Sequence, residues 1–195
     1  GYGSFSGNVI DFDGLAGSAT LGGGEVLSNQ FSGLGVTFAV PNFNAFASTS
    51  IAGTSSLNSD PNVIWVDQAG GSGGASAMGM TINFSTPQSK VGLLLLGSLS
   101  STFTVEAYNG GTLLESLTST LAAGGVGLEG FLALADANIT KVIVYSTNSS
   151  GQNWNFSIDD LKFDTSAAVP EPGSLLLLGT GLAAILGRRR LKERA

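Results

Sequence analysis

The first 164 residues contain no stretch in which apolar side chains recur with the period of a helix. Short apolar or alternating runs are separated instead by clusters of Gly, Ser, Asn and Thr. In residues 102–108 (TFTVEAY) polar and apolar side chains alternate, which gives a strand one wet face and one buried face. Many short strands with frequent turns predict an all-β fold, specifically an antiparallel β-sandwich of the jelly-roll-like kind.

Ten runs have the length and composition of β-strands. They are residues 8–12, 35–40, 63–66, 78–84, 90–96, 102–108, 112–118, 129–134, 139–145 and 155–163. The sequence Asn109-Gly110-Gly111 predicts a tight hairpin turn between two of these runs, because Asn and Gly tolerate positive φ. The leucines of Leu93–Leu96 predict a strand that is buried on both faces, since the run is far too short to span a bilayer.

The chain contains no cysteine and no histidine. Their absence excludes disulfides, Cys/His zinc sites, thiol nucleophiles and Ser-His-Asp triads. The glycine runs Gly22–Gly24 and Gly70–Gly74 lack the preceding strand, the following helix and the lysine of a phosphate-binding loop, so we expect them to be surface loops. Carboxylates, lysines, tyrosines or a bound cofactor remain as routes to acid–base chemistry, but most enzyme mechanisms are excluded, and we expect a protein that is not an enzyme and has no cofactor other than a possible structural Ca²⁺.

The charges divide the chain into two unequal parts. Residues 1–169 carry three lysines and twelve carboxylates, 3 − 12 = −9, whereas residues 170–195 carry five basic and two acidic side chains, 5 − 2 = +3. A globular part with this negative charge repels phosphate backbones, which excludes nucleic acid as a partner. The chain begins with Gly rather than Met, which we interpret as the result of removal of a secretory signal peptide.

The C-terminal region has three parts in a fixed order. Val169-Pro170-Glu171-Pro172 is followed by an uncharged apolar block, residues 173–187, and then by a basic cluster, residues 188–195. As a helix the block is about 22 Å long, a short membrane span, and arginines directly after it are typical of the cytoplasmic side. The sequence thus predicts an extracytoplasmic domain (1–164), a linker with the Pro-Glu-Pro sequence (165–172), a transmembrane helix (173–187) and a cytoplasmic tip (188–195).

This order of parts closely resembles the PEP-CTERM sorting signal of exported proteins in Gram-negative bacteria that make extracellular polysaccharide. The two prolines favour an extended backbone with few hydrogen-bond donors, a conformation that a processing enzyme can bind. The resemblance implies an exosortase-type transpeptidase as partner, with the membrane bound through the C-terminal helix. The residues implied to form the sorting motif are Val169, Pro170, Glu171 and Pro172, and those that stop translocation are Arg188, Arg189 and Arg190.

The first part of the chain resembles, more loosely, the secreted domains that often precede this tag. The fragments Phe12–Leu15 and Ile158–Phe163 recur in such domains. The resemblance implies an exported surface or extracellular-matrix protein, associated with exopolysaccharide and without catalysis. It would be anchored in the inner membrane before processing and reach the cell surface or matrix afterwards.

Four carboxylates form a candidate metal site, namely Asp11, Asp13, Asp159 and Asp160. Terminal strands of such sandwiches often lie side by side, so these carboxylates can converge on a cation, and hard oxygen ligands suit a structural Ca²⁺. The alternative is that adjacent strand residues point to opposite faces, which leaves one of Asp159 and Asp160 in solvent.

Aromatic side chains provide the candidate sugar contacts. Trp65 and Trp154, with Tyr108 and Tyr145, are expected either to stack on sugar rings or to belong to the core, where large apolar side chains are usually found. Stacking would make the domain a carbohydrate-binding module. A secreted hydrolase that uses two carboxyl groups roughly 5–10 Å apart is a third possibility, although nothing in the sequence singles out such a pair.

Overall fold

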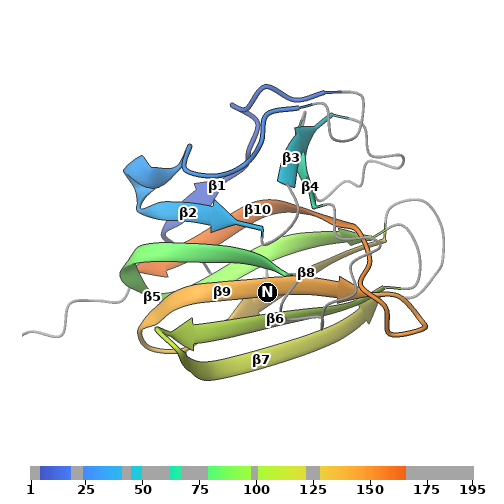
Figure 1. Ribbon diagram of the computed structural model, residues 1–195. Helices are drawn as coiled ribbons and strands as arrows, with labels where there is room; N and C mark the ends of the chain where they lie inside the picture. The colour runs from blue at the N-terminus through green and yellow to red at the C-terminus, as the bar shows by residue number, and fades with distance from the viewer. Residues whose placement is uncertain are drawn as a thin grey trace, which may run out of the picture.

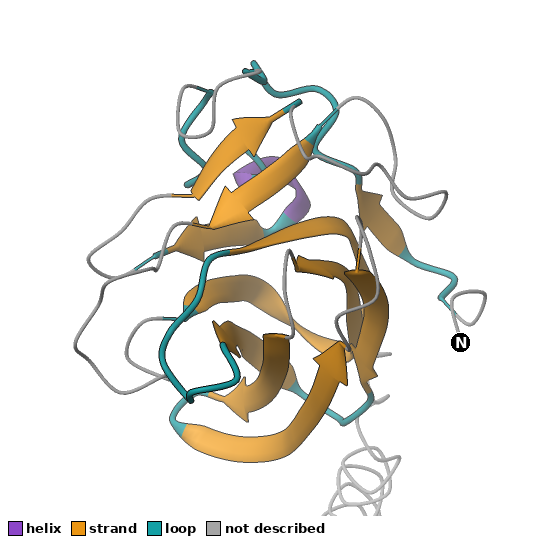
Figure 2. Cartoon of the chain, turned by 90° about the vertical axis from the view of Figure 1, so that its right-hand side faces the viewer, coloured by secondary structure: helices purple, strands orange, loops and turns teal. Residues whose placement is uncertain are grey.

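The computed structural model describes residues 5–18, 24–40, 45–49, 62–66, 79–97, 101–121 and 128–165. These residues form β1 (Asn8–Ile10), a short 3₁₀ helix η1 (Ser32–Leu34), β2 (Val36–Ala39), β3 (Ala45–Ser48), β4 (Val63–Val66), β5 (Met80–Gly97), β6 (Ser101–Asn109), β7 (Thr112–Leu121), β8 (Leu128–Leu134), β9 (Ile139–Thr147) and β10 (Phe156–Thr165). Every pairing between these strands is antiparallel. The all-β prediction is confirmed, and in Figure 2 the described part of the chain shows strands with one short helical segment.

The predicted helix at residues 173–187 lies outside the described residues. Within the described ranges, no helix has the length and apolar character needed to cross a membrane.

Strand β5 belongs to two sheets. Its first part, residues 80–84, pairs with β2 and β9. Its second part, residues 91–97, pairs with β8 and β10. We call the layer β2-β5-β9-β6-β7 sheet I and the layer that contains β8, β5, β10, β4, β3 and β1 sheet II. Figure 1 shows the strands of sheet I side by side, with β10 behind β5.

The change of sheet occurs at Pro87. Between Asn83 and Gln88 the β5 strand advances five residues while β9 advances two, from Lys141 to Ile139. Proline has no N–H to donate to the ladder, so it is tolerated where pairing is interrupted. The buried Gln88 side chain donates to the carbonyl of Thr86 at 2.7 Å, which helps to hold the bend.

The core lies between the two sheets. The ring of Phe103 on β6 meets Phe156 on β10 edge to face, with centroids 5.8 Å apart. Phe84 on β5 packs against Phe163 on β10 at 5.4 Å. Such contacts between inner faces define a sandwich, so the β-sandwich prediction is confirmed. Each of these large aromatic side chains removes a large apolar area from water and so contributes strongly to the stability of the core.

Residues Leu93–Leu96 are buried on both faces of sheet II, as the sequence predicts. Leu93 and Leu95 join the main core. Leu94 and Leu96 face outward and form a smaller cluster with Val63, against which Phe131 packs. Both faces of this strand segment are covered by apolar side chains. For this reason apolar and polar residues do not alternate along Leu93–Leu96.

Two local features set the geometry of the sheets. Gly110, with φ of 56°, is the first residue of the two-residue turn between β6 and β7, a position at which glycine is favoured. On β10, the segment from Asp159 to Lys162 contains one residue more than its partner segment on β5, from Leu94 to Gly92. This bulge places Asp160 at a φ of 46° and keeps Leu161 and Phe163 in the core.

Candidate functional site

The outer face of sheet I is largely polar, with Leu113 and Ile143 as apolar side chains level with Tyr108 and Glu106. Along β6 the outward positions are Thr102, Thr104, Glu106 and Tyr108. Each is level with residues on both neighbouring strands, for example Thr104 with Thr118 on β7 and Tyr145 on β9. The hydroxyl groups of Thr102 and Thr120 lie 3.0 Å apart, and those of Thr104 and Thr118 lie 3.1 Å apart. These rows of hydroxyl groups follow from strand alternation, because the opposite side chains Phe103, Val105 and Ala107 fill the core.

Two tyrosines share one carboxylate at the centre of this face. The hydroxyl of Tyr108 donates to Glu106 Oε2 at 2.7 Å, and the hydroxyl of Tyr145 donates to Glu106 Oε1 at 3.2 Å. The ammonium group of Lys141 lies over the ring of Tyr108, 4.4 Å from its centroid. All four side chains are half-buried. We call Glu106, Tyr108, Tyr145 and Lys141 the tyrosine–glutamate cluster.

The cluster keeps both phenols protonated. The hydrogen bond to Glu106, followed by burial and the negative charge of that carboxylate, raises the pKa of Tyr108 to about 12. Burial, followed by the charge of Glu106, raises the pKa of Tyr145 above its ordinary value. Both hydroxyl groups therefore remain hydrogen-bond donors at any physiological pH, and the geometry around Glu106 stays fixed.

We expect Glu106→Gln to lower the pKa of Tyr108 from about 12 toward 10, because glutamine accepts a hydrogen bond without the negative charge. In the wild type the raised pKa contributes stability that is complete below about pH 10, the unfolded value, and is lost as the pH rises through about 12. Phenolate absorbance measures the titration, with Tyr108→Phe to assign the signal. Glu115→Gln, on the next strand, is the control; an unchanged pKa in Glu106→Gln would contradict the assignment.

The structure places the four predicted metal ligands on or just after the paired strands β1 and β10. β1 and β10 lie side by side, with Ile10 opposite Leu161, so the expectation for the terminal strands is confirmed. Asp159 is fully buried, and its Oδ1 accepts the N–H of Asp160 at 2.8 Å. Asp11 is exposed. Asp13 accepts the N–H of Asn62 at 2.9 Å and thereby connects the segment after β1 to β4.

Calcium binding by these four residues stays a prediction. Within the described ranges, no three acidic side chains are grouped so that they could hold a metal ion. If calcium is bound, chelator should lower the melting temperature and added calcium should restore it. An unchanged melting temperature would remove Asp11, Asp13, Asp159 and Asp160 from the candidate ligands.

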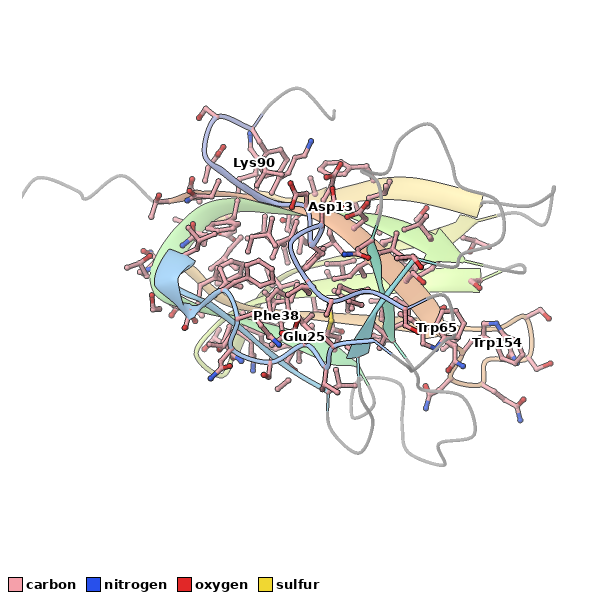
Figure 3. The ribbon with its side chains drawn as sticks, turned by 90° about the horizontal axis from the view of Figure 1, so that it is seen from above. Asp13, Glu25, Phe38, Trp65, Lys90 and Trp154 are labelled. Carbon is pink, nitrogen blue, oxygen red and sulfur yellow. The ribbon has the colours of Figure 1, made fainter. Side chains whose placement is uncertain are left out.

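The predicted tryptophans both lie near the start of β10. Trp65 on β4 is level with Ser157, and Trp154 precedes that residue by three positions. Figure 3 shows Trp65 and Trp154 toward the same end of the molecule, whereas Asp13 lies away from that end. Both are half-buried rather than fully enclosed in the core. Sugar stacking by Trp65 and Trp154 stays a prediction.

The residues of the predicted sorting tag, from Val169 to Arg190, lie outside the described residues. Residues 168–190 match the PEP-CTERM protein-sorting motif. The chain therefore carries a PEP-CTERM sorting motif where the sequence predicts it, after the last strand of the sandwich. No curated protein matches the chain.

Several solved structures resemble the chain at low sequence identity. The carbohydrate-binding module TmCBM61 in complex with β-1,4-galactotriose is 14% identical, with a TM-score of 0.39, over 76% of this chain and 92% of that one. The CBM22-2 xylan-binding domain of Paenibacillus barcinonensis Xyn10C is 10% identical, with a TM-score of 0.42, over 82% and 99%. An exo-β-agarase is 12% identical, with a TM-score of 0.46, over 69% of this chain and 23% of its own. At these scores the likenesses carry no argument about function.

Proposed function

We propose that this chain is an exported protein of the cell surface or extracellular matrix, released from the inner membrane by an exosortase-type enzyme. The observation that carries the proposal is the PEP-CTERM sorting motif at residues 168–190. Such a motif implies export and membrane-anchored processing in a Gram-negative type of cell envelope. The apolar block 173–187 would hold the chain in the membrane until the tail is removed.

The sandwich domain has the organisation that this route requires. Its last strand, β10, ends at Thr165, three residues before the motif begins. All the strand pairings described above therefore lie on one side of the motif, and cleavage of the tail would leave them intact. The domain would pass from membrane to matrix as a folded unit.

We further propose that the domain acts by binding rather than by catalysis and that it associates with exopolysaccharide. The lack of histidine and cysteine removes the thiol nucleophile and the most common general base from the chain. The hydroxyl-rich outer face of sheet I favours a sugar-binding role. A secreted hydrolase is the weaker alternative, because the carboxylate at the centre of this face is held by two tyrosine hydroxyls rather than paired with a second carboxyl group.

Comparison of two bacterial strains that differ only in the exosortase gene tests the sorting proposal. With the gene, the protein should be released and its intact mass should correspond to a new C-terminus near residues 169–172. Without the gene, it should remain full-length in the membrane fraction. The same mass in both strains would contradict the proposal.

A further inference from the structure

We propose that the outer face of sheet I, centred on the tyrosine–glutamate cluster, binds an uncharged polysaccharide chain. The inference rests on the proposed association with exopolysaccharide and names the surface and the class of sugar. Three observations carry it: the grouping of hydrogen-bonding side chains on three neighbouring strands, the balance of charge on that face and the fixed geometry of the cluster.

The face offers both kinds of hydrogen-bonding group that sugar hydroxyls need. A carboxylate has about four acceptor positions, and the two tyrosines occupy one on each oxygen of Glu106. The tyrosine oxygens accept in turn, while Lys141 and the threonine rows donate. A sugar hydroxyl donates and accepts at once, so it is complementary to such a surface, whereas a carbonyl or a phosphate only accepts.

The charge of the domain favours a neutral polymer over an anionic one. Glu106 and Lys141 balance each other on the outer face of sheet I. The remainder of residues 1–169 carries two lysines and eleven carboxylates, 2 − 11 = −9. A polyanion such as a uronate polymer or a nucleic acid would be repelled by this surrounding field. An uncharged polysaccharide chain is not repelled by this negative charge.

The cluster is organised before any ligand binds. Tyr108 is fixed on two sides, by its hydrogen bond to Glu106 and by the ammonium group of Lys141 over its ring. Tyrosine has few rotatable bonds, so a ligand that contacts it costs little side-chain entropy. The same face is a poor interface for a second copy of this chain, because the centres of stable protein interfaces are apolar, whereas hydroxyl and charged groups surround the two apolar side chains Leu113 and Ile143 on this face.

The test is affinity electrophoresis of the full chain, kept soluble in a zwitterionic detergent without sugar groups. The gels contain xylan or β-1,4-galactan as neutral probes, or alginate as the anionic probe. We expect retardation by at least one neutral polymer and none by alginate. Glu106→Gln and Tyr145→Ala should each weaken retardation at least tenfold, while Glu25→Gln, at a half-buried glutamate that lies outside sheet I, should leave it unchanged.

Unfolding of a variant cannot be mistaken for loss of binding, because Glu106→Gln keeps the shape of the side chain and its melting temperature is measured alongside. Absence of retardation by both neutral polymers, or retardation by alginate alone, would overturn the proposal. It would also fail if Trp154→Ala abolished binding while Glu106→Gln did not, or if Glu106→Gln dissociated a dimer of the chain in sedimentation. Processing of Glu106→Gln should be normal, so failure here leaves the sorting proposal standing.

Discussion

Glu171→Ala will trap the full-length chain in the membrane fraction of cells that contain an exosortase-type enzyme. The recognition sequence Val169–Pro172 is short, and Glu171 is its only charged side chain. Prolines on both sides favour an extended backbone that presents this carboxylate to an enzyme. Neither folding of the sandwich nor insertion of the apolar block depends on it. We therefore expect loss of nearly all release with no loss of synthesis, as measured by immunoblots of membrane and secreted fractions.

Two further variants separate recognition from anchoring. Replacing Leu177 and Leu178 by Asp should prevent stable insertion, because charged side chains in a membrane span are costly, and the chain should then escape unprocessed. Glu193→Ala, which removes a carboxylate after Arg188–Arg190, should be processed like the wild type. Normal release of Glu171→Ala would reduce the Pro-Glu-Pro sequence to a linker and remove the main support for the sorting route.

Phe163→Ala will lower the free energy of unfolding by about 3–5 kcal/mol, as expected for a fully buried phenylalanine. Its ring is 1% exposed and packs on Phe84 across the two sheets. A loss of this size is a large share of the roughly 5–15 kcal/mol that stabilises a typical domain. Urea titration of residues 1–168, followed by tryptophan fluorescence, measures it.

The matched control is Leu113→Ala, at a side chain that is 50% exposed on β7. It should cost less than about 1 kcal/mol, because little apolar surface returns to water. If Phe163→Ala leaves too little folded protein to titrate, Phe163→Leu should show a smaller loss that is still larger than the control. Equal values for Phe163→Ala and Leu113→Ala would contradict the placement of Phe163 between the sheets.

Much of the fold can be predicted from the sequence, because strand alternation and turn residues are local signals. The alternation along 102–108 correctly assigns Phe103 and Val105 to the core, and Asn109-Gly110-Gly111 correctly marks the hairpin. β3 (Ala45–Ser48) is missed, since four small or aromatic residues near a proline give no clear pattern. The runs at 78–84 and 90–96 are predicted as two strands but form the single strand β5, because Pro87 reads as a break.

The candidate cluster cannot be found from sequence in the same way. Glu106 and Tyr108 are two residues apart on one strand, so their shared face is predictable. Tyr145 joins them only because β6 and β9 pair with Thr104 level with Tyr145, a register that no local pattern specifies. The bulge at Asp160 is a similar case. Simple alternation would turn Leu161 outward, and the extra residue on β10 reverses that.

The position of β10 determines how the domain bears a mechanical load. β10 lies inside sheet II, with β5 along one edge and β4 and β1 along the other. The hydrogen bonds of β10 are perpendicular to the strand. Tension applied along β10 from the tail therefore loads all the hydrogen bonds of both ladders in shear, and does not break them one after another. If the tail anchors the chain in the membrane and the outer face of sheet I holds a polysaccharide, as proposed, drag on that polysaccharide would load both ladders of β10 in shear.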